Sequence, residues 1–157
     1  MIEQPVHCSS FVLDRTYPYA PERVFSAWAS AKAKARWFAG PEGWTELERV
    51  FEFRPGGRET AKGRFPDGKV SYFDARFHEI VPNRLLVYAY DMYVNDKKLS
   101  VSLASVEFLP EGTGTLLRMT EQGVFFGSKD DAPGREQGTV WLLDKLAAAL
   151  SNPHVAH

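Results

Sequence analysis

The sequence lacks several features that would place it in a familiar class of protein. Cys8 is the only cysteine among 157 residues, so the chain can form no intrachain disulfide and no thiolate metal cluster. No stretch approaches the ~18 consecutive apolar residues of a membrane-spanning helix, and the first ten residues do not have the basic and apolar regions of a secretion signal. We therefore expect a soluble, cytoplasmic protein with no membrane partner.

An excess of charge of one sign is also missing. The 19 basic and 20 acidic side chains give a net charge of -1, which creates no field that would attract nucleic acid or anionic lipid. With 44% hydrophobic and 25% charged residues, the composition is that of a globular protein. We expect one domain over residues 1–157, with a core at about residues 10–150 and a loose tail at 151–157.

Sequence motifs for metal binding and covalent catalysis are absent too. The chain contains no HExxH segment, no pair of cysteines and no GxSxG segment, and His154 and His157 lie in the tail. The glycines of RPGGRETAKG follow no phosphate-loop pattern and are explained by turns. We expect no metal, no cofactor and no catalytic nucleophile.

Aromatic side chains, by contrast, are abundant, with 11 Phe, 6 Tyr and 4 Trp. Each of them can bury roughly 150–250 Å² of surface, which predicts a broad interior but fits a packed core as well as a pocket. Three of the rings, Trp37, Phe38 and Trp44, flank the helix-breaking segment GPEG. These rings either close one end of the core or border a cavity.

The periodicity of the chain predicts its elements. Residues 9–17 favour a strand, and helical spacing begins in YAPERVFSAW, with Pro21 in the first turn. Ser30 is a suitable cap for a second helix, AKAKARWF. Residues 44–122 then alternate between apolar and polar positions and contain short turns such as PDG, which predicts six consecutive antiparallel strands.

One irregularity is expected within these strands. In LSVSLASVEF the apolar positions change phase, from Leu99, Val101 and Leu103 to Val106 and Phe108. Because an extra residue in one strand produces such a change, the pattern predicts a β-bulge near Ala104.

A long helix is expected at the C-terminal end of the chain. It begins near DDAPGREQG, with Asp130 or Asp131 as its cap. A spacing of 100° per residue turns one side of this helix toward the sheet, namely Thr139, Leu142, Leu143, Leu146 and Leu150. Trp141 falls on the wetter side, where it either packs under a neighbouring loop or contributes to a homodimer interface.

This order of elements predicts an α+β fold. A curved, seven-stranded antiparallel sheet wraps around the long C-terminal helix, and two short helices lie between strands one and two. A single helix of roughly 10 Å diameter need not fill the concave side of such a sheet. The hollow left between helix and strands is the candidate site.

A family resemblance supports this architecture. The segments that carry it follow one another over about residues 10–150 as YPYAPERVFSAW, ARWFAGPEGWT, FEFRPGGR, EIVPNRLLVYAYDM, SLASVEFLPEGTGTLLRMTEQGVF and GREQGTVWLLDKLAAAL. They resemble bacterial homologues of the activator of the heat-shock protein ninety ATPase, in the START-like (SRPBCC) superfamily. The resemblance implies a helix-grip fold with a deep apolar cavity, but it says less about activity, because members of the superfamily bind, carry, cyclise (as the polyketide cyclases do) or hydrolyse different molecules.

Candidate ligand-binding residues are the apolar side chains expected to face or border the hollow. They are Trp37, Phe38 and Trp44 of the loop, Phe51, Phe53, Phe73 and Phe77 of the strands, and Leu142 and Leu146 of the helix. For each of the strand residues, ordinary core packing is the simpler explanation, and the same alternative applies to the helix residues.

Four polar side chains are candidates for contacts with a polar end of the ligand, namely Tyr88, Tyr90, Glu59 and Glu121. The two tyrosines share a face, but LLVYAYDM is apolar on both faces, so the sequence does not decide which face lines the hollow. Glu59 alternates in phase with Ala61, which indicates the inner face, where a buried carboxylate would have a raised pKa and could act as an acid or base.

The function that we expect is binding of a small, largely hydrophobic molecule. The alternatives are a cyclase-like or hydrolase-like enzyme that uses a buried Glu or Tyr, and a co-chaperone that activates a heat-shock ATPase. The eukaryotic activator combines this fold with a second domain, for which 157 residues leave no room. A chaperone partner is therefore the weaker alternative.

Overall fold

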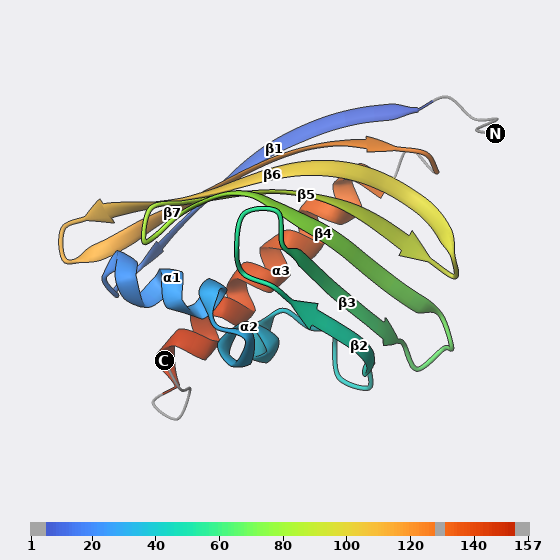
Figure 1. Ribbon diagram of the computed structural model, residues 1–157, viewed down its shortest axis with the longest axis horizontal. Helices are drawn as coiled ribbons and strands as arrows, with labels where there is room; N and C mark the ends of the chain where they lie inside the picture. The colour runs from blue at the N-terminus through green and yellow to red at the C-terminus, as the bar shows by residue number, and fades with distance from the viewer. Residues whose placement is uncertain (1–5, 128–130, 153–157) are drawn as a thin grey trace.

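A computed structural model describes residues 6–127 and 131–152 and confirms the predicted architecture. Seven antiparallel strands form one sheet in the order β1-β7-β6-β5-β4-β3-β2, and the sheet curves over α3 (Figure 1). The elements are β1 (His7–Tyr17), α1 (Pro21–Ala29), α2 (Ala31–Trp37), β2 (Thr45–Phe51), β3 (Arg58–Arg64), β4 (Val70–Val81), β5 (Leu85–Val94), β6 (Lys97–Glu111), β7 (Gly114–Phe125) and α3 (Asp131–Ser151).

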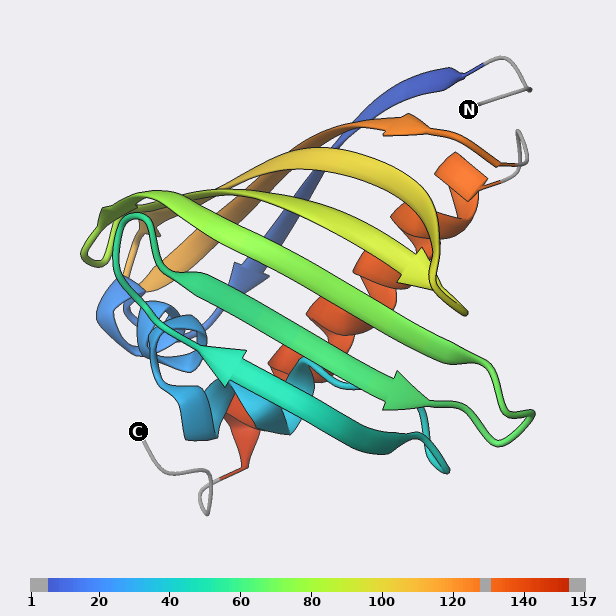
Figure 2. The ribbon, with the colours of Figure 1, turned by 45° about the vertical axis from the view of Figure 1, so that its right-hand side comes forward.

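The first strand closes the topology. β2 to β7 follow one another as a meander. β1 pairs along its whole length with β7, so the first and the last strand of the chain are neighbours in the sheet. Figure 2 shows α3 running diagonally across the concave face of this sheet, with α1 and α2 at one end. The two short helices therefore cover one end of the concave side and leave the rest to α3.

Local signals fix the two short helices, as the sequence predicts. Pro21 occupies the first turn of α1, where its missing N–H would have no helical partner. The Ser30 hydroxyl accepts a hydrogen bond from the Ala33 N–H at 3.3 Å and caps α2. No described helix is both long enough and apolar enough to cross a membrane.

The expected bulge near Ala104 is wrong. β6 pairs with β7 without interruption through this residue, and the shift in pairing with β5 falls instead between Met92 and Tyr93. β6 keeps one phase, with Ser100 and Ser102 buried on the inner face. The apolar residues that suggested the bulge, such as Leu103, belong to the outer face.

The C-terminal helix is fixed to the core by its second half. Leu143, Leu146 and Leu150 are buried against the sheet and the short helices, as expected. Asp131 is the first residue of α3, and the alternative cap, Asp130, lies outside the described residues. The first half of the helix has a different environment, because it borders a cavity.

Candidate functional site

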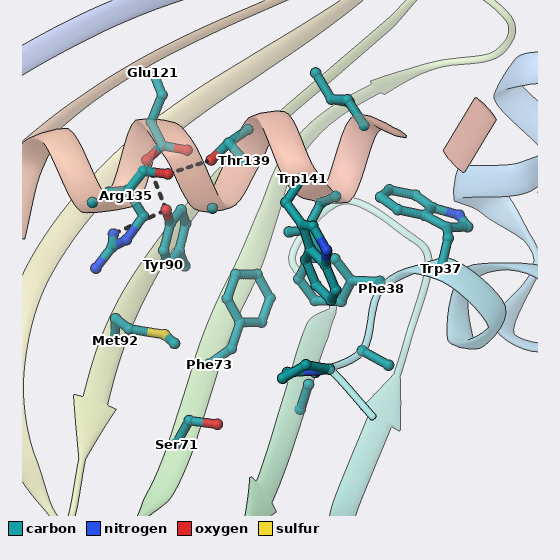
Figure 3. Close-up of a pocket in the computed structure, with 18 of the residues that line it drawn as sticks. Trp37, Phe38, Ser71, Phe73, Tyr90, Met92, Glu121, Arg135, Thr139 and Trp141 are labelled. Atoms are coloured by element: carbon teal, nitrogen blue, oxygen red, sulfur yellow. Dashed lines mark hydrogen bonds between the residues drawn. The ribbon is translucent and has the colours of Figure 1, made fainter. Parts of the chain in front are cut away.

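A cavity of about 500 Å³ lies between the concave face of the sheet, the first half of α3 and the loop that joins α2 to β2. This volume falls within the range of ~300–1,000 Å³ that is typical of small-molecule sites. Figure 3 shows Trp37 and Phe38 toward one end of the cavity, and Glu121, Tyr90 and Arg135 toward the other. The cavity therefore has an aromatic end and a polar end.

The aromatic end is built by the loop rings that the sequence singles out. Trp37, Phe38 and Trp44 all line the cavity. The Trp37 indole is buried and donates its N–H to the carbonyl oxygen of Ala27 at 3.0 Å, while the Phe38 ring meets Phe73 edge to face, with centroids 4.9 Å apart. These rings both pack the core and border the cavity, so the two alternatives are not exclusive.

Glycines allow Trp44 to reach this position. A Cβ on Gly40 or on Gly63 would overlap the Trp44 ring, so the indole packs directly on the backbone at both places. Its N–H points at the Ser71 hydroxyl at 3.4 Å. The close approach explains why β3 carries a glycine within a strand, where a side chain would normally be favoured.

The first half of α3 forms the opposite wall. Trp141 is 40% exposed, lines the cavity and has the Lys145 ammonium 4.6 Å from the centre of one of its rings. Gly134 and Gly138 also line the cavity, and a Cβ on either would meet no atom within 4 Å. The two glycines, one helical turn apart, leave open space along this wall.

Three strands and α3 supply the polar end. The Tyr90 hydroxyl donates to Oε2 of Glu121 at 2.7 Å and accepts a hydrogen bond from Nη1 of Arg135 at 3.0 Å. Arg135 also donates to the hydroxyls of Ser102, at 3.4 Å, and Ser100, at 2.8 Å. The guanidinium group is thereby fixed by three hydroxyl groups on two neighbouring strands.

Glu121 faces the cavity, and the structure settles which face of β5 lines it. Tyr88 and Tyr90 both point inward and line the cavity, as Glu121 does. The strand register places Tyr88, Ala104 and Glu121 in one row across β5, β6 and β7. Tyr88 and Glu121 therefore line the cavity on either side of Ala104, which is itself completely buried.

Burial controls the ionisation of these groups. Desolvation raises the pKa of the Glu121 carboxyl above its usual 4.5, and the hydrogen bond from Tyr90 and the charge of Arg135 oppose this rise. Burial likewise raises the pKa of Tyr88 well above 10.0, and the negative charge of Glu121 adds to the effect. Both tyrosine hydroxyls are therefore neutral hydrogen-bonding groups at physiological pH.

Some residues that the sequence singles out lie outside the cavity wall. Eight of the candidate ligand-binding residues do line the cavity, namely Trp37, Phe38, Trp44, Phe73, Tyr88, Tyr90, Glu121 and Leu142. The others, Phe51, Phe53, Phe77, Leu146 and Glu59, lie in or against the core. Phe51, Phe53 and Phe77 pack on one another, with ring centroids 5.1–6.1 Å apart, and so fill the space at the end of the sheet beneath α1.

Glu59 has a different role from the acid or base that the sequence suggests. It is buried on β3, and its Oε1 accepts a hydrogen bond from the ammonium group of Lys34 at 2.8 Å. The Lys34 nitrogen lies 4.5 Å from the ring centre of Phe38 and 5.2 Å from that of Trp28. Desolvation lowers the pKa of Lys34, and Glu59 opposes this change. The pair is a structural ion pair beside the aromatic end of the cavity.

Sequence patterns did not indicate Arg135, Ser100, Ser102 or Lys34. Arg135 lies in the polar first turns of a helix, and Lys34 lies in AKAKAR, which resembles a solvated helical face. The one available signal was the serine pair at alternate positions of β6, in phase with Ala104. Within the part of the chain that the structure describes, no three His, Cys, Asp or Glu side chains come together as metal ligands would.

Comparison with solved structures finds the same fold in bacterial proteins. A protein from Rhizobium loti is 42% identical, with a TM-score of 0.86, over 93% of this chain and 99% of its own. A putative uncharacterized protein from Rhizobium leguminosarum is 37% identical, with a TM-score of 0.88, over 93% of this chain and 96% of its own. A protein from Chromobacterium violaceum is 25% identical, with a TM-score of 0.74, over 91% of this chain and 97% of its own.

Sequence comparison places the chain in a family. No protein of the curated set matches it significantly. The family described as Activator of Hsp90 ATPase homolog 1-like protein matches residues 18–151, which include every element from α1 to α3. Its helix-grip fold is one that, in general, binds hydrophobic ligands. The chain belongs to this family of activator of Hsp90 ATPase homologues, within the START-like superfamily.

Proposed function

We propose that this protein binds a small, largely apolar molecule in the cavity between the sheet and the first half of α3. The observation that carries the proposal is the cavity of about 500 Å³, with rings at one end and a fixed group of polar side chains at the other. Apolar walls with a few oriented polar groups are typical of small-molecule sites. The rings supply burial of apolar surface, and the polar end supplies orientation.

Native mass spectrometry of the purified protein tests this proposal, together with titration by the uncharged fluorescent dye N-phenyl-1-naphthylamine. We expect either a copurified molecule or saturable dye binding at one site per chain. The variant Gly138→Leu extends a side chain into the open space beside α3 and is expected to weaken dye binding at least tenfold. Glu136→Leu, on an exposed position of the same helix, is the matched control and should leave binding unchanged. Equal binding by all three proteins would place the dye elsewhere and contradict the proposal.

A second candidate function is proton transfer on a bound ketone. It is favoured by the Glu121 carboxylate on the cavity wall, whose raised pKa and Tyr90 neighbour are those of a general base. The carboxylate would take a proton from the carbon beside the carbonyl and return one to it. In D₂O, the protein should then exchange the α-protons of 1-tetralone for deuterium faster than Glu121→Gln does. Equal rates would eliminate this function and leave ligand binding intact.

A further inference from the structure

We infer that the polar end of the cavity is a subsite for an uncharged hydroxyl group on the ligand, which donates to Oε1 of Glu121 and accepts from the hydroxyl of Tyr88. The inference rests on the proposed function and narrows it to a class of ligand. That class is an apolar frame that ends in an alcohol or a phenol.

Two buried polar groups on the cavity wall carry the inference. Glu121 is 2% exposed, and only its Oε2 receives a hydrogen bond; Oε1 has no donor among the described residues. Tyr88 is 5% exposed, and its hydroxyl has no hydrogen-bond partner within the described part of the chain. Both side chains line the cavity, so their unpaired oxygens face the space that a ligand would occupy and mark a place for a polar ligand atom.

The register places the two side chains in one part of the cavity wall, where a single ligand group is proposed to meet both. Tyr88 and Glu121 stand in the same row, separated by one strand and by the methyl group of Ala104. Ala104 is completely buried, so this row continues from the core into the cavity wall. A larger side chain at this position would fill the space between the tyrosine and the carboxylate. Tyr88 and Glu121 thus border the same part of the cavity, while Ala104 between them is covered and does not line it.

The charges around this place favour a neutral group. The Lys34 ammonium, 6.0 Å from the centre of the Tyr88 ring, is already paired with Glu59. Arg135 already donates to the hydroxyls of Tyr90, Ser100 and Ser102, so three of its five N–H donors are used within the protein. A ligand carboxylate would face the Glu121 carboxylate, and Asp131, also on the cavity wall, adds a second negative charge. Like charges in a poorly solvated site repel strongly.

An ammonium group fits less well than a hydroxyl for a different reason. It has three donors and no acceptor, whereas the unpaired atoms are one carboxylate oxygen and one tyrosine hydroxyl. It would also lose its hydration next to the positive charge of Arg135. A hydroxyl has one donor and can accept, so it satisfies both protein groups at once.

Binding of four compounds with one naphthalene frame tests the inference by isothermal titration calorimetry. They are 2-naphthol, 2-methylnaphthalene, 2-naphthoate and 2-naphthylmethylammonium. We expect 2-naphthol to bind about tenfold more tightly than 2-methylnaphthalene, because a net hydrogen bond to a charged group is worth at least that factor. Both ions should bind more weakly than 2-naphthol.

Matched variants assign the preference to the two side chains. Glu121→Gln and Tyr88→Phe keep the size of each residue and are each expected to reduce the preference for 2-naphthol over 2-methylnaphthalene to less than threefold. Glu79→Gln, at an exposed position of β4, and Tyr93→Phe, outside the cavity wall on β5, should keep the preference of the unaltered protein. Circular dichroism of each variant checks that it is folded. The comparison of the four ligands on the unaltered protein tests the inference even if a variant does not fold.

The outcomes separate this inference from the proposed function. If 2-naphthol and 2-methylnaphthalene bind equally well, or if either ion binds most tightly, the hydroxyl subsite is refuted and the ligand cavity stands. If the preference survives in both variants, these two side chains do not form the subsite, and the inference is equally refuted. If none of the four compounds binds and N-phenyl-1-naphthylamine does not bind either, both the inference and the proposed function fail.

Discussion

Replacing Glu59 by glutamine should lower the free energy of unfolding, by an amount that depends on pH. The change removes the charge that faces the buried ammonium of Lys34 at 2.8 Å and leaves the shape of the side chain almost intact. Removing one partner of a buried ion pair typically costs about 3–5 kcal/mol, because the other charge is left without compensation. A domain with a total stability of roughly 5–15 kcal/mol would lose a large part of it.

The structure also sets an upper bound on this cost. Lys34 can lose its proton instead of remaining buried with an uncompensated charge. Deprotonating a lysine with the usual pKa of 10.5 costs about 4.8 kcal/mol at pH 7, at 1.36 kcal/mol per pH unit. We therefore expect a loss of about 3–5 kcal/mol at pH 7. With a denaturant slope of about 2 kcal/mol per molar, the urea midpoint falls by roughly 2 M.

The sign of the pH dependence follows from the pKa of Lys34. Desolvation lowers this pKa in the folded state, so between the lowered pKa and 10.5 the unfolded chain holds a proton that the folded protein has lost. Stability therefore rises with pH in that window. The charge of Glu59 opposes this decrease in the pKa of Lys34. Without Glu59 the pKa of Lys34 falls further, so the pH range in which stability rises with pH begins at a lower pH. The difference between Glu59→Gln and the unaltered protein should then shrink by up to about 1.4 kcal/mol per pH unit from pH 7 to pH 9.

Urea denaturation at pH 7 and pH 9 measures both effects, with Glu79→Gln at an exposed position as the control for loss of a carboxylate. The double variant Lys34→Met, Glu59→Leu removes both charges and should be more stable than Glu59→Gln. A stability of Glu59→Gln within about 1 kcal/mol of the unaltered protein at pH 7, or a difference that does not narrow at pH 9, would show that Lys34 does not depend on Glu59 for its charge.

Three further predictions concern single positions. Because burial raises the pKa of Glu121, folding favours its protonated form, so the stability of Glu121→Gln relative to the unaltered protein should increase as the pH rises above 4.5; a constant difference in urea denaturation would contradict this. Gly138→Ala should stabilise α3 by about 0.5–1 kcal/mol, measured by thermal unfolding, because its Cβ meets open space; a loss would show that the helix needs glycine there. Gly63→Ala should cost about 1–3 kcal/mol and change tryptophan fluorescence, since its Cβ overlaps the Trp44 ring, and an unchanged spectrum would refute that packing.

The fold was predictable because its signals are local. Alternation of apolar and polar residues over short strands, the turn glycine Gly68 with its positive φ of 94°, and the cap at Ser30 each act within a few residues of the chain. The order of these elements leaves few topologies, and the meander with one returning strand is among the simplest. Contacts between distant segments were not needed to predict it.

The polar end of the cavity could not be predicted, because it depends on contacts between distant segments. Ser100 and Ser102 are buried although Leu103 and Val101 beside them are exposed, an arrangement opposite to hydrophobic patterning. The reason is Arg135, 33 and 35 residues further along, which hydrogen-bonds to both serines. A pattern within one strand cannot reveal a partner on another element.

The burial of the charged Lys34 could not be predicted from the sequence, for the same reason. Lys34 lies in a short helix of alternating alanine and basic residues, which is typical of a solvated surface. Its burial is tolerated because Glu59, 25 residues further on, supplies the opposite charge. The phase of Glu59 with Ala61 correctly indicated an inward side chain, but not that lysine would be its partner.

The unequal halves of α3 have a consequence for how this scaffold changes over time. Leu143, Leu146 and Leu150 hold the second half in the core, whereas Gly134 and Gly138 in the first half touch only open space on the cavity side. Substitutions at the two glycines can reshape the chamber without loosening the protein, whereas those at Leu146 and Leu150 endanger folding and leave the chamber's lining unaltered. New specificities can thus arise by a few tolerated steps along one stretch of helix.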